Sequence, residues 1–160
     1  MRQKIAGLLS ACTMLSIGAG SALADYDLRI LHTNDVHDRV ESVTKYNNTC
    51  KAEDDAEGKC FGGYARLATA IRNAKAEGGN VLALDGGDQF QGSLYYSTYK
   101  GTLTAELMAM ADYDAMTIGN HEFDDGPEVL EAFIKASKIP VLSANVHPTA
   151  ASNLKDEIIP

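Results

Sequence analysis

The sequence predicts an α/β fold in which strands and helices alternate in the order βαβαβαβ around a largely parallel sheet. From Asp25 onward, short apolar runs alternate with segments whose apolar residues recur at helical spacing, and glycines or prolines separate them. This alternation is typical of a parallel sheet with helices packed on it. With 160 residues, 45% of them hydrophobic, the chain is long enough for one domain with its own core.

The first 24 residues predict a secretory signal peptide. Arg2 and Lys4 give a positive start, residues 5–24 are apolar and rich in small side chains, and the sequence ALA at 22–24 matches the A-x-A cleavage pattern. Two alternatives stay open, a membrane anchor and lipoprotein processing at Cys12. After signal cleavage we expect no membrane span, and we expect the protein in the periplasm or outside the cell.

The first half of the remaining chain predicts two strands and one helix. Residues 28–31 form a short apolar strand, and residues 41–61 are expected to be a polar loop. A helix is predicted over 64–76, ended by the glycines at 78 and 79, and the next strand covers 81–84. The expected buried face of this helix consists of Leu67, Ile71 and Ala74.

The second half predicts two more helices and two more strands. Apolar residues at helical spacing mark the second helix, which precedes a strand over 115–118. Pro127 occupies a favourable first-turn position for the third helix, and the last strand covers 141–144. The residues expected to be buried are Leu103, Leu107 and Met110 in the second helix, and Val129, Leu130, Phe133 and Ile134 in the third.

Two cysteines, Cys50 and Cys60, remain after signal cleavage. They enclose the polar stretch KAEDDAEGK, which has too few apolar residues to pack by itself. In an exported protein a disulfide closing this loop is expected. The alternative, a metal site, is weaker because neither cysteine has another cysteine or a histidine at zinc-ligand spacing.

Polar clusters follow all four predicted strands. The stretches are HTNDVHD (32–38), DGGDQ (85–89), GNHEFD (119–124) and NVH (145–147). Ligands of open α/β sheets bind at the carboxyl ends of the strands, where separate loops meet at one edge. We therefore expect the clusters at three successive strand ends to form one site, although a single D-x-H or G-G-D stretch is common without a function. His32 is expected to pack beside the first strand, and His147 to be a loop residue.

The residue types in these clusters suit a metal centre. Asp35 and His37 are two residues apart and can reach one ion from an extended turn, and Asp88 has two oxygens that can bridge two ions. Asn120 offers a neutral amide oxygen. Mixed nitrogen and oxygen ligands favour zinc, manganese or iron over a thiolate-bound metal.

The chain resembles the calcineurin-like metallophosphoesterases, and within them the secreted 5′-nucleotidase family, which includes periplasmic UDP-sugar hydrolases and 2′,3′-cyclic-nucleotide phosphodiesterases. The matching stretches are ILHTNDVH (30–37), FGGYARLATAIR (61–72), LALDGGDQFQGS (82–93), YYSTYKG (95–101), IGNHEFDDG (118–126) and PVLSANV (140–146). In one departure, Asp38 follows the histidine of D-x-H where the family usually has a small residue. We expect Asp38 to adjust the charge of the site.

The resemblance implies two divalent metal ions, such as zinc or manganese, and a metal-bound water as the nucleophile. Asp35 and His37 would bind the first ion, Asp88 would bridge both ions, and Asn120 would bind the second. The site would hydrolyse nucleoside 5′-monophosphates to nucleoside and phosphate. Alternatives within the family are a UDP-sugar hydrolase and a 2′,3′-cyclic-nucleotide phosphodiesterase. A net charge of −8 argues against binding a nucleic-acid polymer.

The resemblance also assigns His121 and Asp124 to catalysis. His121 would protonate the leaving oxygen or stabilise the phosphate charge, and Asp124 would fix its tautomer and raise its pKa. A carboxylate beside an imidazole favours the charged form in any protein. In a simpler alternative Asp124 caps the helix that starts at Pro127, a role for which Asp125 is better placed.

Part of the family pattern is missing. The family takes further metal ligands from a later histidine segment of G-H-x-H type and binds the nucleobase with a second domain, and nothing after Asn145 matches either. We therefore expect residues 25–160 to be the N-terminal part of a catalytic domain of the metallophosphoesterase sandwich type, with an incomplete sheet and little activity by itself. The competing hypothesis from another class is a short, non-catalytic chain that binds a metal or a partner. The sequence leaves the oligomeric state open.

Overall fold

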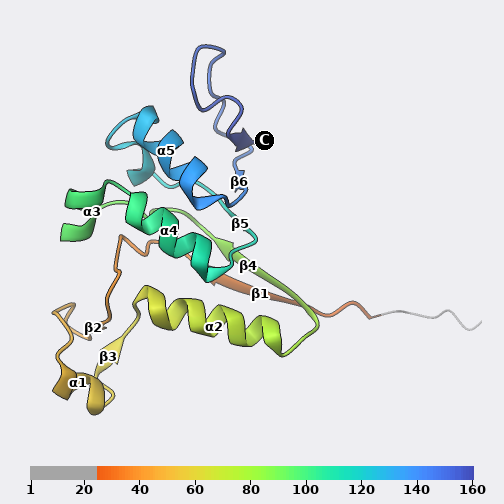
Figure 1. The fold of residues 1–160 in the computed structure, drawn as a ribbon. Helices are drawn as coiled ribbons and strands as arrows, with labels where there is room; N and C mark the ends of the chain where they lie inside the picture. Colours follow the sequence, from red (N-terminus) through yellow and green to blue (C-terminus); the bar gives the residue numbers. More distant parts are fainter. Residues whose placement is uncertain (1–24) are drawn as a thin grey trace, which may run out of the picture.

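The computed structural model describes residues 25–160, so the expected signal peptide lies outside the described residues. The central element is a five-stranded sheet in the order β1-β4-β5-β6-β7, in which every neighbouring pair is parallel (Figure 1). Its strands are β1 (Leu28–Thr33), β4 (Asn80–Asp85), β5 (Ala115–Met116), β6 (Val141–Leu142) and β7 (Ile158–Ile159). The predicted α/β fold with a mostly parallel sheet is confirmed, and β7 adds a strand that the sequence did not suggest.

The helices that connect these strands lie on one face of the sheet. Each new strand is added on the same side of the previous one, and right-handed crossovers then place all connections on one face. Helix α4 packs between α2 and α5 (Figure 1). The helices are α2 (Tyr64–Ala76), α3 (Leu94–Tyr99), α4 (Thr102–Ala111) and α5 (Pro127–Ser137), with a 3₁₀ turn, η1 (His121–Phe123), before α5. Within residues 25–160, no helix has both the length and the apolar character to cross a bilayer.

The core lies between the sheet and this helical layer. The sheet residues that point to the helices include the buried Ala83, Met116, Val141 and Ile158, whereas Leu31 at the edge strand β1 is only partly buried. The opposite face of the sheet is apolar but exposed. Its large exposed apolar side chains are Leu28, Ile30, Leu82, Leu142 and Ile159.

Two of the three predicted buried helix faces are rotated in the structure. In α2 the buried residues are Tyr64, Ala68 and Ile71, whereas Leu67 and Ala74 are only partly buried. In α4 the buried residues are Thr104, Ala105, Met108 and Ala111, whereas Leu103 and Leu107 are partly buried and Met110 is exposed. Small alanine side chains on its buried face let α4 pack closely against α2 and α5. This close packing decided which face of α4 is buried, rather than the burial of its larger apolar side chains. In α5 the expected face is buried except for Val129, which is partly buried.

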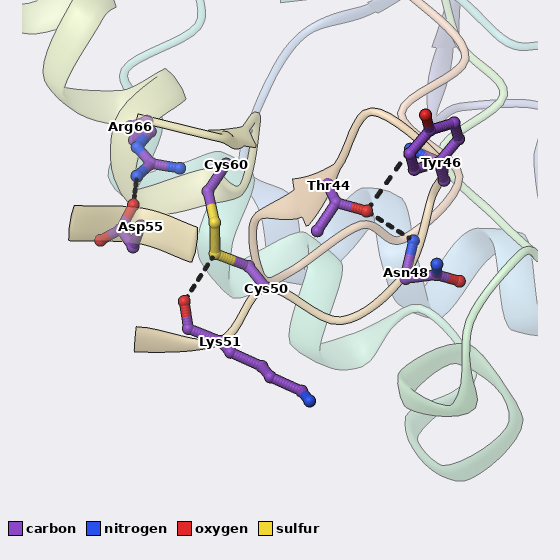
Figure 2. The surroundings of a disulfide bond; sticks show 8 residues. All are labelled: Thr44, Tyr46, Asn48, Cys50, Lys51, Asp55, Cys60 and Arg66. Atoms are coloured by element: carbon purple, nitrogen blue, oxygen red, sulfur yellow. Dashed lines mark hydrogen bonds and ion pairs between the residues drawn. A yellow bond between two sulfur atoms is a disulfide. The ribbon is translucent and has the colours of Figure 1, made fainter. Parts of the chain in front are cut away.

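The prediction of a polar loop over residues 41–61 was wrong. The segment contains a short helix, α1 (Ala52–Ala56), and a two-stranded antiparallel sheet formed by β2 (Val43–Thr44) and β3 (Cys60–Phe61). No residue of α1 is buried, so the sequence has no regularly spaced apolar residues there that would predict a helix. Figure 2 shows Cys50 and Cys60 joined in a disulfide, and Asp55 of α1 paired with Arg66 of α2. The Cα atoms of the two cysteines are 5.8 Å apart.

Candidate metal centre

Three loops meet at the carboxyl edge of the sheet, after β1, β4 and β5. The loop after β1 is joined to the loop after β4 by backbone hydrogen bonds, from Asp35 N to the Gly87 carbonyl (2.9 Å) and from His37 N to the Asp88 carbonyl (3.1 Å). At Gly119, in the third loop, an added Cβ would collide with the Asp88 side chain. The loops are therefore in direct backbone contact, which only glycine permits at this position.

The side chains of Asp35, His37 and Asp88 form one cluster. Their potential ligand atoms all lie within 4.8 Å of one another, and His37 Nε2 is 3.7 Å from Asp35 Oδ1. His37 Nδ1 lies 3.0 Å from the Phe90 carbonyl oxygen. In the tautomer that donates from Nδ1 to this carbonyl, Nε2 is free to bind a metal.

Asn120 lies beside this cluster. With its amide nitrogen turned towards Asp88, that nitrogen is 3.2 Å from Asp88 Oδ2, and the amide oxygen is 3.3 Å from His121 N. The backbone N–H of His121 also donates to Asp88 Oδ1 over 3.0 Å. Asp88 is thus one of the residues that join the loop after β4 to the loop after β5.

His121 faces the cluster and is paired with Asp124. Its ring centroid is 5.3 Å from that of His37, and its Nδ1 atom is 2.7 Å from Asp124 Oδ2. The hydrogen bond to Asp124 raises the pKa of His121 above its ordinary value of 6.5, and desolvation opposes this rise without cancelling it. Asp124 also accepts a hydrogen bond from Gln91 Nε2 (3.0 Å), which fixes the carboxylate beside the imidazole.

Glu122 has a role that the sequence analysis missed. Its carboxylate is fully buried (0% exposed) and accepts four backbone hydrogen bonds, from Asp88 (3.0 Å), Gln89 (2.6 Å), Phe90 (3.3 Å) and Gly119 (2.7 Å). The Glu122 side chain therefore holds together the loop that carries Asp88 and the loop that carries Asn120. The sequence offered little signal for this, because an acidic residue in a loop is usually exposed.

A second buried hydrogen-bond network supports the same loops at the ends of β1 and β4. The Asp85 carboxylate accepts hydrogen bonds from Thr33 Oγ1 (2.5 Å), Gly87 N (2.9 Å) and Gln89 Nε2 (2.9 Å). Burial raises the pKa of Asp85, and these three donors act in the opposite direction. Tyr64 donates to the side-chain oxygen of Gln89, so the first turn of α2 is part of the support.

Asp38 lies in the interior, and the expectation that it adjusts the charge of the site is not supported by its position. The side chain is 1% exposed. It accepts hydrogen bonds from Ser93 Oγ (3.0 Å) and from Thr104 Oγ1. Burial raises the pKa of Asp38, whereas the two hydroxyl donors lower it. Asp38 links the loop after β1 to α3 and α4.

The proposed cap of α5 by Asp125 was wrong. Gly126 occupies the N-cap position without a side-chain hydrogen bond, and Pro127 is the first helical residue. Asp125 instead accepts from Tyr96 Oη (2.6 Å) and pairs with Lys100 Nζ (3.2 Å). Burial, together with the hydrogen bond to Asp125, raises the pKa of Tyr96.

Two further histidines lie outside the cluster. His32 is exposed on the open face of β1, and His147 is exposed in the chain beyond β6. Among residues 25–160, the histidines of the cluster region are therefore His37 and His121.

The structure is thus an α/β protein with a cluster of carboxylate and histidine side chains at the carboxyl edge of a parallel sheet. The family comparison agrees: the profile of the calcineurin-like phosphoesterases matches residues 28–157. The chain belongs to the calcineurin-like phosphoesterase family. Members of this family are metal-dependent, typically with two metal ions.

Individual relatives are 5′-nucleotidases. The chain is 43% identical to snake venom 5′-nucleotidase from Gloydius brevicauda, over 98% of this chain and 26% of the relative. It is 42% identical to 5′-nucleotidase from Homo sapiens, over 85% of this chain and 24% of the relative. The chain thus spans about a quarter of the length of these relatives.

Solved structures show the same fold. NAD nucleotidase from Haemophilus influenzae superposes with a TM-score of 0.72 and 33% identity, covering 83% of this chain and 23% of that one. The 5′-nucleotidase precursor from Thermus thermophilus superposes with a TM-score of 0.70 and 37% identity, covering 83% of this chain and 25% of that one.

Proposed function

We propose that the full-length protein hydrolyses phosphate esters of nucleotides, with nucleoside 5′-monophosphates as substrates. The observation that carries the proposal is the convergence of Asp35, His37 and Asp88 at one edge of the sheet, with the His121–Asp124 pair beside them. The similarity to 5′-nucleotidases from several animals supports the same reaction.

The donor set fits divalent ions. Two carboxylates, one imidazole and the amide of Asn120 are the mixed oxygen and nitrogen ligands that zinc or manganese accept. We assign Asp35 and His37 to one ion, Asp88 to a bridging position and Asn120 to a second ion. When bound, such ions polarise the phosphate and activate a water molecule.

The remaining steps belong to residues of the chain itself. His121 has its Nδ1 atom bonded to Asp124, which leaves Nε2 available to a substrate. Because the pKa of His121 is raised, the imidazole is protonated over a wider pH range. We assign His121 to stabilising the phosphate charge or donating a proton to the leaving oxygen, and Asp124 to holding the imidazole in that state.

Two further assignments concern the extent and the location of the protein. We propose that residues 25–160 form the first part of a longer catalytic domain, because the chain spans about a quarter of its relatives. We also propose that the protein is exported. The signal-like residues 1–24 and the paired cysteines at 50 and 60 support export.

The decisive experiment identifies the products that the full-length protein forms, separated by chromatography. One hydrolysis step releases inorganic phosphate from a nucleoside monophosphate but leaves the phosphate esterified when a pyrophosphate or cyclic diester bond is cleaved. The substrates are AMP, UDP-glucose, 2′,3′-cyclic AMP and NAD, each assayed with Mn²⁺, with Zn²⁺ and with a chelator. We expect metal-dependent release of phosphate from AMP and loss of activity in Asp88→Asn. A preference for another substrate would reassign the substrate, and failure to hydrolyse all four would contradict the proposed function.

A further inference from the structure

We propose that Asp38 is a positioning residue that holds the metal-binding turn Asp35–His37 against α3 and α4. This inference rests on the proposed function, since it assigns to Asp38 a part in holding the metal. It follows from the strained conformation of the turn and from the buried contacts of the carboxylate.

The turn after β1 has an unfavourable backbone. Asp35, His37 and Asp38 have φ values of 53°, 50° and 52°, all in the left-handed region. For residues with a side chain this conformation is unfavourable, and it persists only where the surroundings hold it in place. A turn of this kind needs anchors at both ends.

The first end of the turn is anchored through the backbone. Asp35 N and His37 N donate to carbonyls of the loop after β4, and the His37 ring contacts the Phe90 carbonyl. These bonds position the ligands relative to Asp88. At the far end of the turn, the first backbone bond to another element within residues 25–160 is the one from Tyr64 N to the Val40 carbonyl.

Asp38 supplies the anchor at that far end. Its carboxylate is buried and is held by two hydroxyl groups from different elements, Ser93 at the start of α3 and Thr104 in the first turn of α4. Both are neutral hydroxyl donors, so burying this charge is costly. The cost is consistent with a role in fixing geometry rather than in stabilising the fold.

The segment before α3 lies directly against the same turn. A Cβ at Gly92 would come within 2.8 Å of the His37 carbonyl oxygen and 2.9 Å of His37 Cβ. Ser93 also caps α3 through the backbone N–H of Tyr95 (3.0 Å). Movement of Asp38 away from Ser93 therefore displaces His37 from the segment on which it rests. Outer contacts of this kind typically change metal affinity by about 10–100-fold.

The test is a titration of Mn²⁺ into the metal-free, full-length protein, with the thermal midpoint measured in parallel. Thr104→Val removes one donor to Asp38 and keeps the volume of the side chain, and Thr104→Ser keeps the donor. The matched control is Ser137→Ala, which removes a buried hydroxyl that donates to the Ile134 carbonyl (3.0 Å) at the opposite edge of the sheet. Asp38→Asn serves as a second variant at the anchor itself.

We expect Thr104→Val and Asp38→Asn to weaken Mn²⁺ binding by about tenfold, and Thr104→Ser to stay close to the wild-type affinity. Ser137→Ala should lower the thermal midpoint without changing the affinity. If Thr104→Val lowers the midpoint only and binds Mn²⁺ as the wild type does, the Asp38 proposal is overturned while the metal centre stands. If the wild-type protein binds no Mn²⁺, the proposed metal centre fails and the Asp38 proposal fails with it.

Discussion

The Nδ1 atom of His121 lies 2.7 Å from Oδ2 of Asp124, one turn of 3₁₀ helix further along the chain. The pair forms because η1 places residues three apart on the same side. The imidazole is therefore held by a local contact, whereas the proposed metal ligands are held by contacts between loops that are distant in the sequence.

Replacing Asp124 should lower the pKa of His121. The hydrogen bond to Asp124 is the main cause of the raised value, so in Asp124→Asn the pKa should fall towards the ordinary 6.5. NMR titration of the His121 ring in metal-free protein measures this directly. The alkaline limb of the pH–rate profile should move to lower pH in the same variant. Asp125→Asn is the matched control, because Asp125 bonds to Tyr96 and its replacement should leave His121 unchanged.

His121 itself should be needed for turnover and not for metal binding. We expect His121→Ala to reduce the turnover of the full-length enzyme by about 100-fold or more while metal content stays close to two ions per chain. Asp88→Asn should lose metal as well as activity. Metal content measured by elemental analysis separates the two variants. If His121→Ala lost both ions, His121 would be a ligand and its assignment would be wrong.

Glu122→Gln should destabilise the protein and reduce activity together. A glutamine keeps one acceptor oxygen and replaces the other by a donor. Some of the four backbone N–H groups that bond to the Glu122 carboxylate then lose their acceptor. Each buried N–H that loses its partner costs about 1–3 kcal/mol. Urea unfolding measures the loss, with Glu128→Gln at the exposed start of α5 as the control. An unchanged unfolding midpoint would show that the four hydrogen bonds to Glu122 contribute nothing to stability.

The contact between α2 and the start of β5 should make stability depend on pH in the acid range. Although burial acts to raise it, the pKa of Asp114 is lowered, because the carboxylate accepts from Ala83 N (2.7 Å) and pairs with Lys75 (3.1 Å). A lowered pKa in the folded state contributes stability above the ordinary pKa of an aspartate, about 4, and this contribution is lost as the pH falls below it. Asp114→Asn should therefore be less stable than wild type at neutral pH, with the difference shrinking on acidification. A difference that stayed constant from neutral pH down to acid would contradict this.

The pairing of Cys50 with Cys60 should be visible in the intact mass. The mature protein recovered from its own cells should gain two hydrogen atoms on reduction, and its mass should correspond to a chain that starts at Asp25. Replacing Cys50 and Cys60 by serine should lower stability by about 2–3 kcal/mol, because the closed loop is short. No mass change on reduction would mean that the thiols are free.

The local elements of this protein could be predicted from its sequence where one pattern dominated. The bounds of α2, the start of α5 at Pro127 and the parallel order of the strands all follow from apolar spacing and from glycine and proline positions. The convergence of Asp35, His37 and Asp88 at one edge could also be anticipated, because parallel strands end on the same side.

The sequence by itself therefore determined the alternation of the main strands and helices from β1 to β6 and the identity of the candidate ligands, since both are properties of short stretches of chain. Only the tertiary structure decided which acidic residues are buried supports. In the sequence, Glu122 and Asp38 look like any acidic residue of an exposed loop. Their roles depend on backbone N–H groups and hydroxyls, most of which come from segments far away in the sequence. A buried carboxylate is stable only where several donors converge on it, and no local pattern records that convergence.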